Sequence, residues 1–233
     1  MTDWQFPQKP VDLAEKQLLE AILDGSFPVG SSLPAERELA QQLGITRPTL
    51  RETLQRLSRD GWITIHQGKP TLVNDYWREG NLIMLNALAG HPSQQNPDFI
   101  QDLLEVRCLL APVYTELAVK NAADDLAAYL TPLTQLPDAA EAYAAADPDL
   151  HHQLTVLSGN PVYTLIYNGF RELAYKSSLI YFQQKEARDY SSDFYQGLLL
   201  DARNEDSASA RARTERVMRA SIDFWNQSSH LPG

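Results

Sequence analysis

The feature that most constrains this chain is a pair of short helical segments joined by a tight turn. The first segment runs from about Ala35 to Leu43 and ends at Gly44. The second follows at once, because Thr46 is a good N-cap, a proline is tolerated in the first turn, and Gly61 closes the helix. Two helices of this length with so short a connection predict a helix-turn-helix.

The flanking segments complete a small winged domain. Residues 12–24 place leucines at helical spacing and are followed by Gly25, which predicts another helix. Residues 62–66 form a β-branched run, Gln67 and Gly68 supply a turn, and residues 69–73 return as a second strand. Residues 1–75 are therefore predicted to be a winged helix-turn-helix of three helices and a small β-hairpin wing.

Beyond the hairpin the sequence is helical throughout. We expect one helix from about Tyr76 to Gly90 and then a polar, proline-bounded break at residues 91–97. The helical patterns that follow occupy residues 98–120, 123–131, 138–157, 161–183, 186–204 and 207–228. The predicted fold class is mainly α: a winged helix-turn-helix at 1–75, a linker helix and break at 76–97, and an all-α helical-bundle effector domain at 98–233.

Charge and cysteine content restrict the class of protein further. The 233 residues carry a formal charge of −10, yet residues 30–73 hold six basic and four acidic side chains, and residues 76–233 hold twelve basic and twenty acidic ones. A mildly basic tip on an acidic body suits a protein that contacts DNA at one end. Cys108 is the only cysteine, which excludes an intramolecular disulfide. No apolar run is long enough for a membrane span, so we expect a cytoplasmic protein without a membrane partner.

The start of the second short helix carries the side chains best suited to DNA. Arg47 and Arg51 lie four residues apart and therefore on one helix face, where a guanidinium can contact guanine O6 and N7 with two hydrogen bonds. Thr46 and Thr49 suit phosphate or base contacts, and Lys69 at the hairpin tip suits a phosphate near a minor groove. The alternative is that these arginines are ordinary solvated side chains of an amphipathic helix.

The N-terminal part resembles the DNA-binding domain of GntR-type transcription regulators over the run FPVGSSLPAERELAQQLGITRPTLRETLQRLSRDGWITIHQGKPTLV. Over nearly its whole length the chain also resembles the fatty acid metabolism regulators of that family, the FadR-like proteins. This second resemblance rests on NDYW at 74–77, LLEVR at 103–107, SGNPVYTLIYNGF at 158–170, YF and EAR near 181–188, and LPG at 231–233.

The resemblance implies a homodimer that binds a palindromic operator in double-stranded DNA. It assigns base contacts to Arg37, Arg47 and Arg51, and supporting contacts to Thr46, Thr49, Gly68 and Lys69. The wing departs from the family pattern, because His66 precedes Gln67 here and the two residue types are exchanged in FadR-like proteins. Gln67 is therefore expected to replace the histidine contact.

The resemblance also implies an effector ligand. FadR-like proteins hold a long-chain acyl-CoA inside the helical bundle and then leave the DNA; they repress fatty acid degradation genes and activate unsaturated fatty acid synthesis genes. Ser221 and Trp225 match positions near the CoA, and Tyr181 is assigned to the same site. Met218 stands where the family has glycine, and Ser229 and His230 stand where it has a lysine. We therefore expect the CoA phosphates to be bound more weakly or differently.

Two features of the predicted bundle bear on the ligand without any resemblance. Arg107 shares a helix face with an apolar stripe that includes Leu103 and Leu104, and a buried guanidinium needs an anionic or carbonyl partner. That partner is either an internal carboxylate or a ligand, so the alternative function is a regulator that senses a small organic acid through Arg107. The aromatic residues of one later helix either line an acyl tunnel or form plain core: Tyr163, Tyr167, Phe170, Tyr175, Tyr181 and Phe182.

A metal site and an enzyme are the remaining alternatives. Asp147 and His151 lie four residues apart, as two ligands on one helix face do. Many GntR-type relatives add two later histidines, but Gln196 and Ser221 stand at those positions here. We therefore expect no metal and no cofactor besides the acyl-CoA effector. We also expect no catalytic residues, because the sequence has neither a nucleophile elbow nor a phosphate loop.

Overall fold

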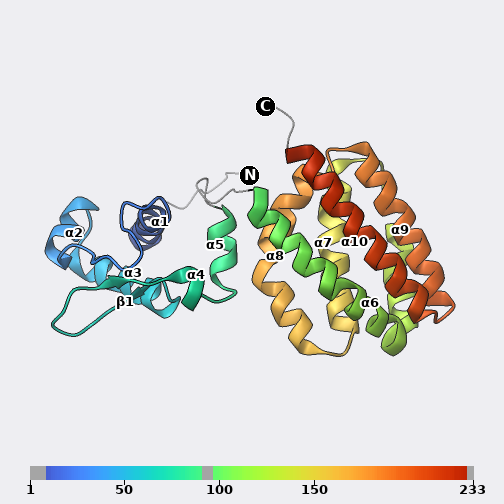
Figure 1. Ribbon diagram of the computed structural model, residues 1–233, viewed down its shortest axis with the longest axis horizontal. Coiled ribbons are helices and arrows are strands. Elements are labelled where there is room, and N and C mark those ends of the chain that lie inside the picture. Colours follow the sequence, from blue (N-terminus) through green and yellow to red (C-terminus); the bar gives the residue numbers. More distant parts are fainter. Residues whose placement is uncertain (1–8, 91–96, 230–233) are drawn as a thin grey trace, which may run out of the picture. The chain divides into compact units, whose positions relative to one another are not determined.

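The computed structural model describes residues 9–90 and 97–229, and it divides into two compact units, Met1–Gln94 and Gln95–Gly233 (Figure 1). The first unit holds helices α1 to α5 and a hairpin, and the second holds α6 to α10. The described residues contain a single two-stranded sheet. The predicted fold class, mainly α with a winged helix-turn-helix followed by a helical bundle, is confirmed.

Three helices form the body of the first unit: α1 (Pro10–Leu23), α2 (Glu36–Gln42) and α3 (Arg47–Arg59). The apolar face of α3 packs on the other two helices and buries Leu50 completely. Thr46 caps α3 as its position predicts, because its hydroxyl oxygen accepts a hydrogen bond from the Thr49 amide at 3.3 Å. Burial of the apolar face leaves the arginines at the start of α3 exposed to solvent.

The wing is a short antiparallel hairpin of β1 (Ile63–Thr64) and β2 (Leu72–Val73). Its strands are much shorter than the two five-residue runs of the sequence pattern, since residues 65–70 form an exposed loop and Pro70 has no amide hydrogen to pair. The other edge of β2 is also paired, which the sequence pattern does not predict. Ser32 bridges Leu72, and the Val73 amide donates to the Ser31 carbonyl at 2.9 Å.

Two short helices, α4 (Tyr76–Glu79) and α5 (Met84–Gly90), follow the hairpin, so the prediction of one continuous helix was wrong. The break starts at Gly80, whose backbone is extended (φ −69°, ψ 171°). Just beyond it, the Asn81 side chain accepts a hydrogen bond from the Ile83 amide at 2.9 Å. Glycine is a poor helix former and asparagine offers the backbone a local partner, and together they outweigh the helical spacing of the apolar residues.

Replacing Gly80 by alanine is expected to destabilise the first unit. A Cβ atom there would collide with the carbonyl oxygen of Tyr76, which is backbone, and would crowd the Met84 sulfur. We expect Gly80→Ala to lower the free energy of unfolding by about 1–3 kcal/mol, the usual cost of overpacking. Urea unfolding measures this, with the exposed neighbour Glu79→Ala as control. Equal stability of the two variants would contradict this account of the break.

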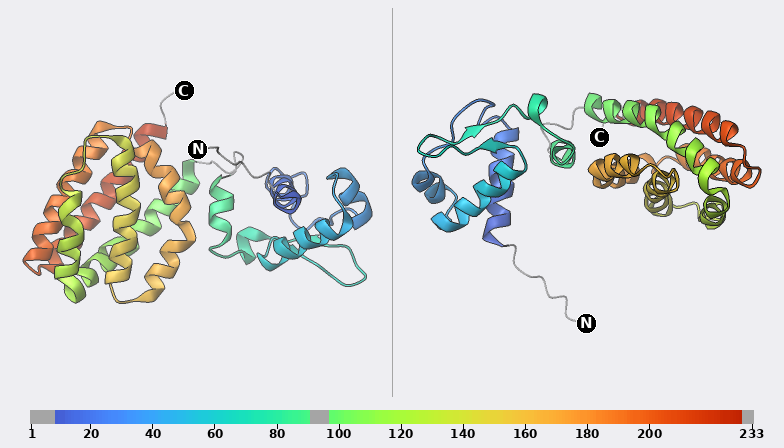
Figure 2. Two further views of the ribbon diagram at one scale, coloured as in Figure 1. Left: turned by 180° about the vertical axis from the view of Figure 1, so that it is seen from behind. Right: turned by 90° about the horizontal axis from the view of Figure 1, so that it is seen from below.

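The second unit, as far as it is described, is a bundle of five helices: α6 (Pro97–Leu133), α7 (Ala140–Leu157), α8 (Pro161–Tyr181), α9 (Lys185–Arg203) and α10 (Ser207–Ser229). α6 packs most extensively on α10 and also contacts α7 and α9 (Figures 1 and 2). α8 lies at the edge of the bundle with α7 as its main neighbour. Leu126, Leu150 and Tyr195 are fully buried in the core between these helices.

The helix ends of this unit follow local sequence signals. Ala122 has a non-helical conformation (φ −153°, ψ 50°) and kinks α6 where the sequence pattern separates two helices. α8 begins after Asn160, whose side chain accepts a hydrogen bond from the Val162 amide at 3.1 Å. Glu205, with φ of 53°, turns the chain from α9 into α10.

Across the described residues, no helix is both long and apolar enough to cross a membrane.

Candidate functional site

The exposed face of α3 and the neighbouring start of α2 form the first candidate site. Arg37, Arg47 and Arg51 are all exposed. Arg51 donates from Nε to Glu36 Oε2 at 2.8 Å, whereas Arg37 and Arg47 make no hydrogen bond or ion pair with any other described residue. The surface therefore presents two unpaired guanidinium groups and a third that is held by a carboxylate.

The tip of the wing and the N-cap of α3 supply the remaining candidate contacts. Gln67, Gly68 and Lys69 are exposed, and Gly68 adopts a left-handed conformation (φ 72°) with open space where a side chain would be. The hydroxyl oxygens of Thr46 and Thr49 lie 2.9 Å apart, so one hydroxyl donates to the other. The start of α3 thus offers hydroxyl groups, and the tip of the wing offers a cation and an unhindered backbone.

An ion-pair network orients α3 on α1. The Arg56 guanidinium donates to Asp12 at 2.9 Å, to Glu15 at 3.3 Å and to Glu52 at 2.8 Å. The Arg56 side chain is 32% exposed, and ion pairs at the surface contribute little to stability. Most of the stability of this packing therefore comes from the buried leucines, while the ion pairs fix the direction of the helix.

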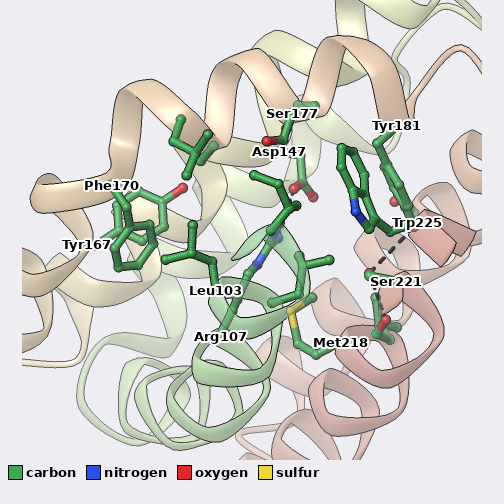
Figure 3. A pocket seen from close by; sticks show the side chains of 17 residues that line it. Leu103, Arg107, Asp147, Tyr167, Phe170, Ser177, Tyr181, Met218, Ser221 and Trp225 are labelled. Atoms are coloured by element: carbon green, nitrogen blue, oxygen red, sulfur yellow. Dashed lines mark hydrogen bonds and ion pairs between the residues drawn. The ribbon is translucent and has the colours of Figure 1, made fainter. Parts of the chain in front are cut away.

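The second candidate site is a cavity inside the five-helix bundle (Figure 3). The centres of water molecules can occupy about 70 Å³ of it, several times the roughly 10–15 Å³ that one water needs. All five helices contribute to its wall, through residues that include Leu103, Arg107, Asp147, Tyr167, Phe170, Tyr181, Ser191, Met218, Ser221 and Trp225.

The wall of this cavity has an apolar part and a polar part. Leu103 of α6 and Phe170 of α8 belong to the apolar part. Tyr181, Ser221 and Trp225 lie together at the other end, where the Tyr181 hydroxyl donates to Ser221 Oγ at 3.5 Å (Figure 3). Burial raises the pKa of Tyr181 to about 12, so its hydroxyl stays protonated at neutral pH. A guest in the cavity would meet hydrocarbon at one end and hydroxyl and indole groups at the other.

A largely buried ion pair lies in the same wall. Arg107 donates from Nη2 to Asp147 Oδ2 at 3.0 Å, and the Tyr195 hydroxyl donates to the other carboxylate oxygen at 3.0 Å. Burial acts to raise the pKa of Asp147, but the charge of Arg107 and the hydrogen bonds from Arg107 and Tyr195 act together against it, and the pKa lies below its ordinary value. The internal carboxylate that was one expected partner of Arg107 is present, and it is Asp147. Arg107 Nε is buried without a hydrogen-bond partner among the described residues.

The aromatic side chains of α8 and its end divide between cavity and protein contacts. Tyr167, Phe170 and Tyr181 line the cavity. The other three contact protein groups: Tyr163 packs on Tyr114, Tyr175 donates to Asp149, and Phe182 packs on Tyr143. Half of these six aromatic side chains therefore face the cavity, and the other half contact protein groups.

Comparison with known proteins places the chain in a family. Residues 11–73 match the family described as bacterial regulatory proteins, gntR family, and residues 74–232 match the FadR C-terminal domain. The chain belongs to the GntR family of transcription regulators, with a FadR-type C-terminal domain. The fatty acid metabolism regulator protein of Shewanella halifaxensis is 43% identical over 189 residues, 81% of this chain and 79% of that protein. The same-named protein of Shewanella amazonensis is 44% identical over 186 residues, 80% of this chain and 78% of that protein.

A solved structure shares the fold of this FadR-type regulator. Lar of Listeria monocytogenes has a TM-score of 0.62 at 17% identity, covering 96% of this chain and 99% of that chain. At that identity the likeness shows the fold alone. Family membership establishes that the chain is a DNA-binding transcription regulator and not an enzyme.

The four positions considered for a metal do not converge in this FadR-type domain. Gln196 is exposed and donates to Ser192 at 3.4 Å, whereas Asp147 is buried. Tyr195 faces Asp147 instead, because one residue along a helix turns a side chain by about 100°. Within the described ranges 9–90 and 97–229, no three His, Cys, Asp or Glu side chains are grouped to hold a metal ion.

His151 is fully buried near the Arg107–Asp147 pair. Its Nδ1 lies 2.8 Å from the Tyr114 hydroxyl, and its Nε2 has no hydrogen-bond partner among the described residues. Burial first, and then the positive charge of Arg107, lower the pKa of His151 to about 3. The imidazole is therefore neutral in the folded protein at physiological pH, and the Tyr114 hydroxyl donates to Nδ1.

The low pKa of His151 is expected to make the protein less stable in mild acid. The unfolded chain takes up a proton at this histidine below pH about 6.5, while the folded protein does not, so stability is lost as the pH falls. Between pH 7 and pH 5 the wild type should lose about 2 kcal/mol more than His151→Gln, as measured by urea unfolding at each pH. The exposed His66→Gln should follow the wild type. Parallel curves for wild type and His151→Gln would contradict a neutral buried imidazole.

Proposed function

We propose that this regulator binds a palindromic operator in double-stranded DNA as a homodimer, and that a long-chain acyl-CoA bound in its C-terminal cavity releases it. The cavity carries the proposal, because a FadR-type bundle encloses a space with an apolar part and a hydroxyl- and indole-bearing end. The name of the relatives, fatty acid metabolism regulator, supports the ligand class. We propose that the regulator represses fatty acid degradation genes and activates unsaturated fatty acid synthesis genes.

On the DNA side, α3 enters the major groove and the wing approaches the adjacent minor groove. Arg47 and Arg51 contact base edges from α3, and Arg37 does so from α2. Supporting contacts come from Thr46, Thr49, Gln67, Gly68 and Lys69. The exposure of all three arginines and the burial of the opposite face of α3 support this arrangement. In a symmetric dimer, two such helices bind half-sites about one turn of DNA apart.

Arginine and lysine substitutions should affect DNA binding in two different ways. We expect Arg47→Ala and Arg51→Ala each to weaken operator binding by about 1–3 kcal/mol and to relax the base preference, because a bidentate base contact is lost. Lys69→Ala should weaken binding to all sequences and reduce the salt dependence by about one unit of slope. Fluorescence anisotropy with operator and scrambled duplexes across a salt series measures both quantities.

Arg78→Ala is the matched control for these variants. Arg78 is an exposed arginine of the same unit that lies outside α2, α3 and the wing. It should retain the base preference and the operator affinity of the wild type. Unchanged operator affinity in both Arg47→Ala and Arg51→Ala would remove α3 from the proposal.

On the ligand side, we propose that the acyl chain lies against Leu103 and Phe170 and that the thioester end lies near Tyr181, Ser221 and Trp225. Met218, only 2% exposed, fills wall space that a glycine would leave open. His230 and the Ser229 side chain, which stand where FadR-like proteins have a lysine, lie outside the described part of the chain.

Release from DNA requires that the ligand bind more tightly to a state that does not fit the operator. A tenfold loss of DNA affinity needs about 1.4 kcal/mol of differential ligand binding, which burial of a few methylene groups supplies. The segment that carries α4 and α5 connects the two units in sequence, and we propose that it transmits the change.

An acyl-CoA titration tests the proposed effector. Oleoyl-CoA added to the protein–operator complex at fixed salt should release the DNA, and free CoA should not, because the acyl chain supplies the apolar contact. Leu103→Trp should block release by filling the cavity. Val106→Trp is the matched control, since Val106 lies on the same helix but is 45% exposed and does not line the cavity. Release from Leu103→Trp at wild-type ligand concentrations would argue against this site.

A sensor of a small organic acid is the second candidate function, and Arg107 is the observation that favours it. Arg107 lines the cavity, and its Nε is buried without a partner among the described residues, so it could bind a carboxylate. This function would be favoured if a small carboxylic acid released the DNA and no acyl-CoA did. The Arg107→Ala variant should then abolish that release. Arg107→Ala/Asp147→Ala is the required companion, because the single change leaves a buried carboxylate unpaired.

A further inference from the structure

Glu36 is an acidic side chain within the surface proposed to face DNA. It is the first residue of α2, lies beside Arg37, and accepts the hydrogen bond from Arg51 Nε at 2.8 Å. A carboxylate close to DNA phosphates lowers affinity, because like charges repel. Its position must therefore provide something that offsets this loss.

Folding stability does not account for Glu36. The Arg51 and Glu36 side chains are 66% and 39% exposed, and ion pairs of that exposure contribute little. The favourable interaction of an acidic side chain with the start of a helix does not single out Glu36 either, because Glu38 lies in the same first turn. The hydrogen bond to Arg51 is what distinguishes the two glutamates.

The bond between Glu36 and Arg51 is compatible with base contact. A guanidinium has five N–H donors, and this bond uses the one on Nε. Four donors remain on the two terminal nitrogens, and a bidentate contact to guanine O6 and N7 uses two of them. Arg51 can therefore contact a base while it keeps its bond to Glu36.

We propose that Glu36 is a positioning residue that holds Arg51 in the orientation needed for base contact, an inference that rests on the proposed DNA contact of Arg51. A free arginine side chain samples many rotamers and loses this freedom when it binds. The bond to Glu36 removes part of that freedom in advance and fixes the direction of the terminal nitrogens. Arg37 and Arg47, which have no such partner among the described residues, must order on the DNA. Arg51 therefore imposes the strictest base requirement of the three arginines.

The carboxylate also acts against binding to unrelated DNA. Its charge opposes every phosphate near the surface, while the orientation of Arg51 rewards only a base that fits. Glu36 thus lowers the affinity for non-operator DNA, and on the operator the orientation of Arg51 offsets this repulsion. The property that it changes is the ratio between operator affinity and non-operator affinity.

The test measures this ratio with full-length protein at fixed salt. The probes are the duplex that the wild type selects in vitro from a random library and a scrambled duplex of the same composition. We expect Glu36→Ala to reduce the ratio about 5- to 20-fold, as expected for loss of a coupled contact, without weakening binding to the scrambled duplex. Glu38→Ala removes the same charge from the same helix turn and should leave the ratio within about twofold of the wild type. Glu36→Ala weakening both duplexes equally would show a structural role and overturn the inference.

A double-mutant cycle separates this inference from the function on which it rests. In an Arg51→Ala background, Glu36→Ala should change the ratio by less than about twofold, because its effect passes through Arg51. Glu36→Gln keeps an acceptor oxygen and should recover part of the loss. If Arg51→Ala lowers the ratio but Glu36→Ala does not, the positioning role is wrong and the Arg51 contact stands. If Arg51→Ala leaves the ratio unchanged, the DNA contact itself is wrong.

Discussion

The Arg107–Asp147 ion pair is the interaction on which the second unit depends. It joins α6 to α7, and Tyr195 extends it to α9, so three helices of the bundle meet at one carboxylate. Loss of either charged partner leaves a largely buried charge uncompensated, at a cost of about 3–5 kcal/mol, a large part of the stability of an ordinary domain. Because the pair also lies in the cavity wall, the charges that hold the helices together also set the electrostatic environment of a guest.

Burial and the positive charge of Arg107 also determine the state of a neighbouring polar group. They keep His151 neutral, so its Nδ1 accepts from the Tyr114 hydroxyl. Asp147 has both carboxylate oxygens occupied, one by a guanidinium and one by a phenol. Two residue types that bind metals in other proteins are therefore engaged in a network of hydrogen bonds between helices.

Sequence alone predicts much of this fold because local signals decide where helices begin and end. Thr46 and Asn160 cap their helices through their own side chains, and glycines and prolines mark the other boundaries. What the sequence does not predict depends on contacts between distant residues. The second edge of β2 pairs with a segment some 40 positions earlier, and the Tyr195 hydroxyl reaches Asp147 from another helix, 48 positions along the chain.

The candidate sites show the same division. Arg47 and Arg51 follow from their spacing on one helix, and Ser221 and Trp225 follow from a family resemblance. The first two are exposed on α3, and the last two line the cavity. Glu36 does not follow from either, since its partner is 15 residues away on another helix. The available signal was an acidic residue within the mildly basic segment 30–73, and charge alone does not tell which arginine it pairs with.

The pairing of β2 with the segment before α2 closes the first unit into a ring. The chain runs from that segment through α2, α3 and β1 and returns in β2, where backbone hydrogen bonds join the two ends. The wing cannot shift against the helix-turn-helix without breaking these bonds. The distance between the proposed major-groove contacts and the proposed minor-groove contacts is therefore fixed within one copy of the chain. Under the proposed function, a ligand that acts on such a rigid body would change the distance between two copies on DNA and leave unaltered the set of bases that each copy accepts.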